Sequence, residues 1–514
     1  MSKMFKFIYS SLFVLLLVAT NAILSTTSFA ASSNEKPLVE LDLYLINDFQ
    51  GQLRHNGDIP GAATLASSIF ELGKNNPGGT IILGGGDMIH GTLDSKLHDG
   101  IPAILALNNF GFSASVLGTD ELIYSKAIVE KQQKTAAFPF LAANIIDKNG
   151  TPIFSPYKII ERKGLKIAII GLANNKTAFK VLPSNIEGYT FQEPSKIVNK
   201  YIQEVKEKGA DVVVLLTHLG INVNDGKITG DILPTLETAK NVDAVFAASN
   251  NKKISTSYNN IPVVEAGVNG TAIGRVHLLY SRIEKKVIAA NSKLYNIHYG
   301  MVSENEKIAN LLAPLFKEVD EKYGQVIANN VLPLSNNFQA KSAAGDLIAD
   351  FIKEAGNSEI AIINGGSIRT TIPNGPITLR SLLELYPYDG NLVTMNLKGS
   401  DLIATMENAF NLKNTALGRF SGLKITADMS KPLNQRILSI VTTSDGLKIK
   451  PDKYYKVVTN DYLAAGGSNY LALTKGTDLK TGPKIQQVLE FLFRSHKTIN
   501  YTLDDRLTLL NNKY

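Results

Sequence analysis

The amino-acid sequence predicts an α/β protein in two parts joined by a connecting helix. Short apolar, β-branched runs alternate with amphipathic helical segments through residues 36–300 and again through residues 331–514, which is typical of layered sheets covered by helices rather than of an all-β fold. Polar loops repeatedly follow the expected strands, at the sheet edge where α/β proteins bind ligands. Between the two parts, residues 304–323 are charged and helical in spacing, which predicts a connecting helix inside a 301–330 linker.

The first part opens with an apolar strand and then alternates helix and strand. The strands are expected at residues 39–46, 81–83, 114–117, 140–144, 165–172, 212–216 and 242–246, and the helices at 62–72, 103–110 and 194–208. Residues 261–280 and 286–295 are expected to form strand pairs that close this part.

The second part repeats the alternation on a smaller scale. Helices are expected at residues 344–355, 379–386, 402–409 and 485–493, and strands at 360–363, 392–397 and 423–427. Neither an internal repeat nor a low-complexity segment interrupts the chain after residue 30.

The N-terminus is typical of a secretory signal peptide. Lys3 and Lys6 precede the apolar run 12–18, and the small residues Ser28 and Ala30 follow it, so we expect cleavage after Ala30 and export to a periplasm or the medium. A membrane anchor is the weaker alternative because the apolar core is short. No other stretch of the sequence is long and apolar enough to span a bilayer.

Composition narrows the function classes. With two lysines and no acidic residue in 1–30, the formal charge of +7 becomes +5 after cleavage, and the scattered lysines do not form the basic patches that nucleic-acid binding requires. There is no cysteine, so any metal site must use carboxylates, histidine, amides and main-chain oxygens.

The stretch 78–92 carries the first candidate site. The expected strand 81–83 runs into three glycines, which place Asp87 at the strand's C-terminal end. A carboxylate among small residues at that edge suits a divalent cation. The alternative is a Gly-Asp turn that only caps the next segment.

The order of the loop motifs resembles that of the two-domain 5'-nucleotidase family along essentially the whole chain after the leader. The motifs are Asn47-Asp48-x-Gln50-Gly51, Gly86-Asp87, Gly118-Thr119-Asp120-Glu121, Ala143-Asn144, Thr217-His218-Leu219-Gly220, Val242-Asp243, Asn364-Gly365-Gly366-Ser367-Ile368-Arg369 and Ala465-Gly466-Gly467-x-x-Tyr470. The resemblance implies an N-terminal metallophosphoesterase-like domain (36–300) and a C-terminal nucleotide-binding domain (331–514). It also implies two divalent ions between them and hydrolysis of nucleotide phosphate esters.

Several positions depart from the family pattern. Gln50 replaces the histidine of Asn-Asp-x-His-Gly, Thr119 and Asp120 replace the Asn-His pair, Ile123 replaces the Asp that orients that histidine, and residues 248–251 replace Gly-His-x-His. The matching metal ligands are Asp48, Asp87 and His218, with Gln50 and Asn251 as weak amide donors. We therefore expect one divalent ion rather than two, and we assign no catalytic residue, since Asp120 stands where the transition-state histidine belongs. Asp120 and His90 are alternatives that could rebuild the site if their side chains converge on the same ion.

The second part keeps more of the family pattern. By resemblance, Asn364 and Arg369 bind the substrate's anionic or sugar part, and Phe420 and Tyr462 stack on the base. The alternatives are an Arg369 tied to a nearby carboxylate and aromatic rings that belong to the core. Ser468 replaces an acidic residue of the family loop.

Three hypotheses for function follow from these residues. The first is an exported 5'-nucleotidase-family protein whose phosphate-ester hydrolysis is weak or lost. The second is a relative that binds a nucleotide or nucleoside without turnover, and the third is an interaction protein that uses the fold as a scaffold.

Overall fold

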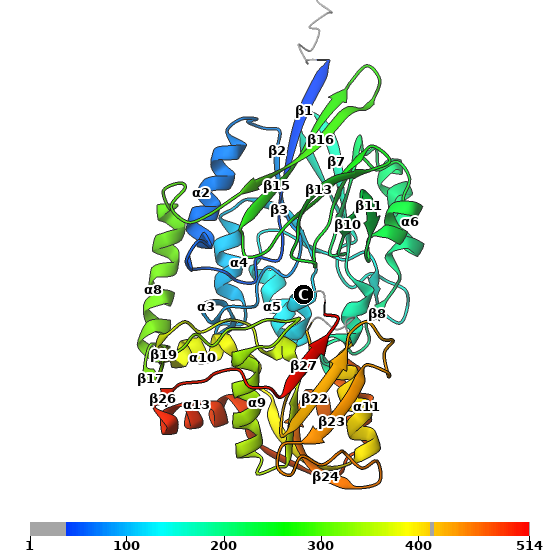
Figure 1. The fold of residues 1–514 in the computed structure, drawn as a ribbon. Helices are drawn as coiled ribbons and strands as arrows, with labels where there is room; N and C mark the ends of the chain where they lie inside the picture. The colour runs from blue at the N-terminus through cyan, green and yellow to red at the C-terminus, as the bar shows by residue number, and fades with distance from the viewer. Residues whose placement is uncertain (1–36, 412–415, 513–514) are drawn as a thin grey trace, which may run out of the picture.

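The computed structural model describes residues 37–411 and 416–512, so the expected signal peptide lies outside the described residues. Figure 1 shows an N-terminal half and a C-terminal half. No helix within 37–411 or 416–512 combines the length and the apolar character that crossing a membrane requires. The architecture is mixed α/β in both halves, as the sequence predicts.

Two six-stranded sheets form the centre of the N-terminal half. The first has the order β16 (Lys286–Asn296), β15 (Ala272–Ser281), β1 (Leu38–Ile46), β2 (Thr80–Gly84), β3 (Phe112–Val116) and β4 (Phe140–Leu141). The second has the order β13 (Lys253–Tyr258), β14 (Ile261–Ala266), β12 (Ala244–Phe246), β9 (Val212–Thr217), β7 (Leu165–Leu172) and β6 (Tyr157–Arg162). Two small ladders flank them, β5 (Ile145–Ile146) with β8 (Thr190–Phe191) and β10 (Asn222–Asn224) with β11 (Lys227–Thr229).

The two sheets face each other across a buried apolar core. Leu41, Leu43 and Leu45 of β1 pack there with Ile167 of β7 and Val214 of β9. Because every second residue of a strand points to the same face, β1 places alternate side chains in this core and the others under the helices. The helices are α2 (Gly61–Gly73), α3 (Leu93–Lys96), α4 (Ile101–Asn108), α5 (Lys126–Thr135), α6 (Pro194–Glu207) and α7 (Leu233–Thr238). Helices α2 and α4 cover the first sheet, and α6 and α7 cover the second, so the half has four layers.

Helix α8 (Glu306–Tyr323) runs along the side of the molecule and connects the halves (Figure 1). It packs against α2, α3 and α4 of the N-terminal half and against α10 (Leu379–Leu385) of the C-terminal half. Asn305 caps its first turn, since the side-chain oxygen of Asn305 accepts from the Ile308 amide.

The C-terminal half is built on a five-stranded sheet. Its order is β21 (Arg419–Ser421), β18 (Ile360–Ile363), β24 (Tyr454–Asn460), β20 (Asn391–Lys398) and β25 (Thr477–Lys484). Two three-stranded sheets adjoin it, β23 (Ile437–Thr442), β22 (Leu423–Asp428) and β27 (Leu507–Leu510), and β19 (Gly375–Thr378), β17 (Val326–Asn330) and β26 (Thr498–Ile499). The remaining helices are α9 (Ala343–Ala355), α11 (Gly399–Ala409), α12 (Asp461–Ala464) and α13 (Ile485–His496). Helices α9 and α13 bury one face of the five-stranded sheet and α11 buries the other.

The strand pairs expected in residues 261–280 and 286–295 are confirmed in part, since β15 pairs with β16, but β14 does not pair with either. Residues 261–280 form two strands that belong to different sheets: β14 pairs with β12 and β13, whereas β15 pairs with β1 and β16. The apolar pattern shows that both strands are buried, but their partners are set by how the two sheets stack.

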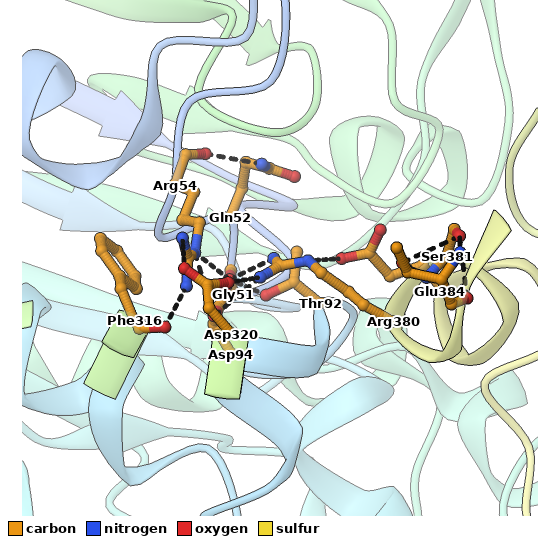
Figure 2. A network of polar contacts seen from close by, with 11 residues as sticks. Gly51, Gln52, Arg54, Thr92, Asp94, Phe316, Asp320, Arg380, Ser381 and Glu384 are labelled. Carbon is orange, nitrogen blue, oxygen red and sulfur yellow. Dashed lines mark hydrogen bonds and ion pairs between the residues drawn. The ribbon is translucent and has the colours of Figure 1, made fainter. Parts of the chain in front are cut away.

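A network of charged side chains joins the two halves (Figure 2). The Asp94 carboxylate of α3 accepts from Arg54 Nε at 3.2 Å and from Arg380 Nη2 of α10 at 2.6 Å. Both arginines also contact Asp320 of α8, and Arg380 Nε donates to Glu384 at 2.9 Å. Four segments distant in sequence therefore meet at one buried carboxylate.

Candidate metal and ligand site at the junction of the halves

Asp48, Asp87 and His218 converge at the C-terminal ends of three strands. Asp48 lies two residues after β1, Asp87 three residues after β2, and His218 directly after β9 of the second sheet. One ligand atom from each lies within 4.8 Å of the other two. The stacking of the two sheets brings His218 beside the two aspartates, because the parallel strands of both sheets end at this edge.

The backbone around the cluster is unusual. Asp48, Asp87, Gln50, Ser249 and Asn251 all have a positive φ, at 48°, 52°, 53°, 90° and 59°. Left-handed backbone at non-glycine residues costs energy and gathers at sites that bind ligands. Position 86 requires glycine, since its φ is 85° and an added Cβ on Gly86 would lie 2.7 Å from His218 Nδ1.

The hydrogen bonds of His218 leave one ring nitrogen for a ligand. Its Nδ1 lies 2.8 Å from the carbonyl oxygen of Gly85, which can only accept, so Nδ1 carries the proton. Its Nε2 is buried and lies 3.2 Å from Asp87 Oδ2, with which it forms an ion pair when the ring is protonated. In the neutral ring the Nε2 lone pair therefore points toward the two carboxylates.

Backbone amides hold the two carboxylates in place. Asp48 Oδ2 accepts from Asn47 Nδ2 at 2.7 Å and from the Ser249 amide at 2.9 Å. Asp87 Oδ1 accepts from the Asp120 amide at 2.7 Å. Each aspartate uses one oxygen in this way, so the site is preorganised by the loops that carry it.

The Glu121 side chain fixes the Asp87 loop by accepting hydrogen bonds from backbone amides. Its carboxylate accepts from the amides of Met88 at 2.7 Å, Gly118 at 2.8 Å and Asp87 at 3.1 Å. Sequence reasoning quoted Glu121 as part of a motif and missed this role. No local sequence pattern could have shown this role, because the three amides come from two loops that are distant in sequence.

Burial and the mutual charges shift the titration of the cluster. Burial raises the pKa of Asp48 to about 6, and the Asp87 charge adds to the shift. Burial lowers the pKa of His218, but the carboxylates of Asp87 and Asp48 outweigh it and raise that pKa to about 10. Burial and the neighbouring Asp87 and Glu121 charges also raise the pKa of Asp120. A proton and a cation compete for the same Nε2 lone pair, so cation affinity should fall as pH falls.

The donor set fits one divalent cation. Two carboxylate oxygens and an imidazole nitrogen are ligand types that zinc-class and manganese-class ions take. Among the described residues, the three-residue cluster includes neither Asp120 nor His90. His90 instead packs edge-on against Tyr124 at 5.5 Å, and burial together with Lys96 and Arg369 lowers its pKa to about 3.

The two expected amide ligands, Gln50 and Asn251, have other surroundings. Asn251 is exposed, and Gln50 is half-buried with its backbone amide donating to the Asp87 carbonyl at 2.9 Å. The buried Glu265 carboxylate accepts from the Asn250 and Lys252 amides and so fixes the loop that carries Ser249. Within the described residues, the three-residue cluster draws no ligand from Gln50 or Asn251.

The C-terminal half brings Arg369 to this site. Arg369 is exposed, and its charge acts on the pKa of both Asp120 and His90. None of the ion pairs within 37–411 and 416–512 includes Arg369, whose Nη1 makes only a long contact of 3.4 Å to the Gly366 carbonyl. Asn364 lies in the same loop, where its Oδ1 accepts from Ser367 Oγ at 2.7 Å and from Asn460 Nδ2 at 3.1 Å.

The two expected stacking rings differ in environment. Tyr462 is 37% exposed at the start of α12. Phe420 is only 2% exposed, because β21 pairs with β18 and turns the ring into the core edge-on against Phe410 at 6.3 Å. The expectation that Phe420 offers a face to a base is therefore wrong, and the alternative of a core ring holds for this residue.

Comparisons with known proteins agree with this architecture. Residues 322–475 match the family model described as the 5'-nucleotidase C-terminal domain. Protein UshA of Yersinia enterocolitica is 26% identical over 509 residues, covering 88% of this chain and 90% of its own. The 5'-nucleotidase precursor of Thermus thermophilus superposes with a TM-score of 0.81 at 23% identity, over 92% of this chain and 100% of its own.

The chain therefore contains a 5'-nucleotidase C-terminal domain and has the two-domain fold of 5'-nucleotidases. Endonuclease YhcR of Bacillus subtilis strain 168 is 25% identical over 505 residues, and the chain spans 41% of the length of that relative.

Proposed function

We propose that this protein is an exported member of the 5'-nucleotidase family that recognises nucleotides at the junction of its halves. We further propose that it holds one divalent ion there and that its phosphate-ester hydrolysis is weak or lost. The observation that carries the proposal is the three-residue cluster itself. It offers a complete ligand set for one ion, whereas Gln50, Thr119, Ser249 and Asn251 stand where the family places further ligands.

Asp48, Asp87 and His218 would hold the ion. When bound, it supplies positive charge that polarises a phosphoryl oxygen and lowers the pKa of an attacking water. Asp87 Oδ1 is already engaged by the Asp120 amide, which leaves Asp87 Oδ2 and the His218 Nε2 lone pair for the ion. Arg369 would bind the anionic part of the ligand, since its guanidinium has no ion-pair partner among the described residues.

Asp120 is the residue that weakens catalysis in this proposal. An imidazolium at this position would stabilise the negative charge that gathers on the phosphoryl group, and Asp120 supplies no positive charge there. Loss of one such preorganised group costs on the order of 10²–10³ in rate. This residue favours the second candidate function, nucleotide binding without turnover.

The test uses the purified chain without its leader, stripped with EDTA. We expect titration with Mn²⁺ to give about one ion per chain, AMP to raise the melting temperature, and phosphate release from AMP to be slow. Two ions per chain with turnover at the rate of an intact family member would refute the one-ion proposal. Failure of AMP and adenosine to shift the melting temperature would favour the scaffold hypothesis.

A pair of variants tests the part assigned to Asp120. Thr119→Asn combined with Asp120→His restores the family residues and should raise phosphate release by at least about tenfold. Thr119→Asn combined with Asp120→Asn removes the charge without adding an imidazole and serves as the matched control. Equal rates in both would show that Asp120 is not what limits hydrolysis.

A further inference from the structure

We infer that a pocket beside helix α8 binds a small aromatic amine and that its occupation stabilises the junction of the halves. The pocket has a volume of about 260 Å³ and lies between the loop that joins β1 to α2, the start of α2, and α8 with the segment that precedes it. Among the described residues, those that line it include no member of the three-residue cluster and none of the Arg369 loop. The inference is therefore independent of the proposed function.

Part of the pocket wall is apolar. Ala309, Leu312 and Phe316 are spaced by three and four residues along α8, so they lie on one face of that helix. Leu53 of the β1–α2 loop and Ala63 of α2 continue this wall, at 2% and 6% exposed. A ligand that contacts these side chains buries apolar surface of its own.

Two stacked rings form the exposed side of the pocket. The rings of His55 and Tyr299 have centroids 3.8 Å apart and planes inclined by 10°. The Tyr299 amide also donates to the Asp58 carbonyl at 3.0 Å, which fixes the segment before α8 to the β1–α2 loop. Because these rings are held before a ligand arrives, contact with a planar ligand costs little conformational entropy. The wall therefore favours an aromatic ligand.

The charges of the lining residues determine the charge of the ligand. Arg54 lines the pocket, but its guanidinium already pairs with Asp94 at 3.2 Å and with Asp320 at 2.9 Å (Figure 2). Glu304 is exposed, and none of the ion pairs within 37–411 and 416–512 includes it. The pocket thus offers an uncompensated carboxylate beside apolar and aromatic surface, which suits an ammonium group joined to a ring.

The volume sets the size of the ligand. An apolar cavity of about 150 Å³ is large enough for benzene. The 260 Å³ of this pocket adds room for a short chain with an amino group, but the volume lies below the range of about 300–1,000 Å³ that is typical of pockets for larger ligands. The molecule 2-phenylethylamine has the required ring, chain and charge and serves as the probe.

Arg54 connects the pocket to the junction. Its guanidinium lies over the Phe316 ring at 4.2 Å, and its Nη2 donates to the Phe316 carbonyl at 2.6 Å. The same guanidinium holds the buried Asp94 carboxylate that also binds Arg380 of the C-terminal half. A ligand packed against Phe316 fills the space beside this arginine, and a ligand that binds only the joined halves stabilises them by mass action.

Calorimetric titration of the full chain in EDTA tests the inference with three probes of one shape. These are 2-phenylethylamine, the neutral 2-phenylethanol and the anionic 3-phenylpropionate. We expect the amine to bind about two- to fivefold tighter than the alcohol, since Glu304 is exposed, and the carboxylate to bind most weakly. The amine should raise the melting temperature, and saturating Mn²⁺ should leave its affinity unchanged.

Four variants locate the bound amine. Glu304→Gln should lower the affinity for the amine to that for the alcohol, whereas Glu321→Gln removes an exposed carboxylate of α8 outside the pocket and should change nothing. Ala309→Leu places a larger side chain in the pocket and should abolish binding of all three probes. Tyr299→Ala should weaken the amine and the alcohol alike, by about two- to tenfold.

The opposite results overturn the inference. If the amine binds no better than 3-phenylpropionate, Glu304 does not select a cation. If Ala309→Leu and Tyr299→Ala both bind the amine as wild type does, the amine binds elsewhere, and competition by Mn²⁺ would place it at the three-residue cluster. If wild type binds none of the probes, the pocket is not a site for this class, and the proposed function is unaffected because its own test uses Mn²⁺ and AMP.

Discussion

The Asp94 network predicts that one isosteric change will loosen the junction of the halves. In Asp94→Asn the two guanidinium groups of Arg54 and Arg380 keep their positions but face an amide instead of a shared carboxylate. The Asp94 side chain is 1% exposed, so water cannot replace the lost charge. The change therefore leaves two partly buried cations with less compensation.

The magnitude follows from burial. Removing one partner of a buried pair costs about 3–5 kcal/mol. Here the arginine side chains are 23% and 20% exposed, and each keeps another partner, since Arg54 Nη2 donates to the Phe316 carbonyl and Arg380 Nε to Glu384. We therefore expect a lower cost of about 2–3 kcal/mol.

Asp320→Asn is the matched control. Asp320 contacts the same two arginines, at 2.9 and 3.4 Å, but its side chain is 54% exposed. An exposed ion pair contributes about 0–1 kcal/mol. The two variants therefore remove the same charge from the same arginines at very different burial.

Urea unfolding followed by circular dichroism and tyrosine fluorescence measures the effect, because the chain has 19 tyrosines and no tryptophan. A chain in two parts need not unfold in one step. We expect Asp94→Asn to move the first transition to lower urea and to separate it from the second, and Asp320→Asn to leave the curve nearly unchanged. Equal shifts in the two variants would refute the reasoning that burial makes Asp94 the centre of the junction.

Three further predictions concern the site. His218→Asn should weaken Mn²⁺ binding on the order of a hundredfold or more, measured by calorimetry, because altering even outer-shell partners of a metal ligand costs about 10–100-fold; unchanged affinity would exclude His218 as a ligand. Glu121→Ala should lower the free energy of unfolding by about 2–3 kcal/mol, since three backbone amides lose their acceptor; a stability equal to wild type in urea would contradict that role. Burial raises the pKa of Glu265 from 4.5 to about 7, so ionisation of this carboxyl destabilises the native state; the cost is absent below the unfolded pKa and grows as pH rises to 7. In EDTA, the stability of Glu265→Gln relative to wild type should therefore rise by about 3 kcal/mol between about pH 4 and pH 8; a pH-independent difference would contradict the shift.

Much of the fold could be predicted because its signals are local. The apolar runs of β1, β7 and β9 are buried on both faces, so they read as strands without knowledge of their partners. Short or edge strands such as β6, β13 and β25 carry more exposed residues and fewer signals, and the sequence analysis did not separate them. Their strand state depends on the neighbour they pair with.

The candidate site also contains residues that the sequence could identify and residues that it could not place. Asp87 could be named because it follows an expected strand through a glycine turn, and Asp48 because its motif resembles one of a known family. Phe420 could not be placed, because whether a ring in a short strand points to solvent or core depends on its register with β18.

By itself the sequence determined the α/β class, the two halves with a helix between them, and the identities of the three residues that could hold a cation. The class and the two halves follow from periodicity within short segments of the chain, and the three residues follow from loop motifs that resemble those of a known family. Only the tertiary structure decided that His218 presents its Nε2 to Asp48 and Asp87, that Asp94 lies buried between two arginines, and that Phe420 is core. Each of these depends on desolvation and on contacts between residues that are distant in sequence, which no local pattern encodes.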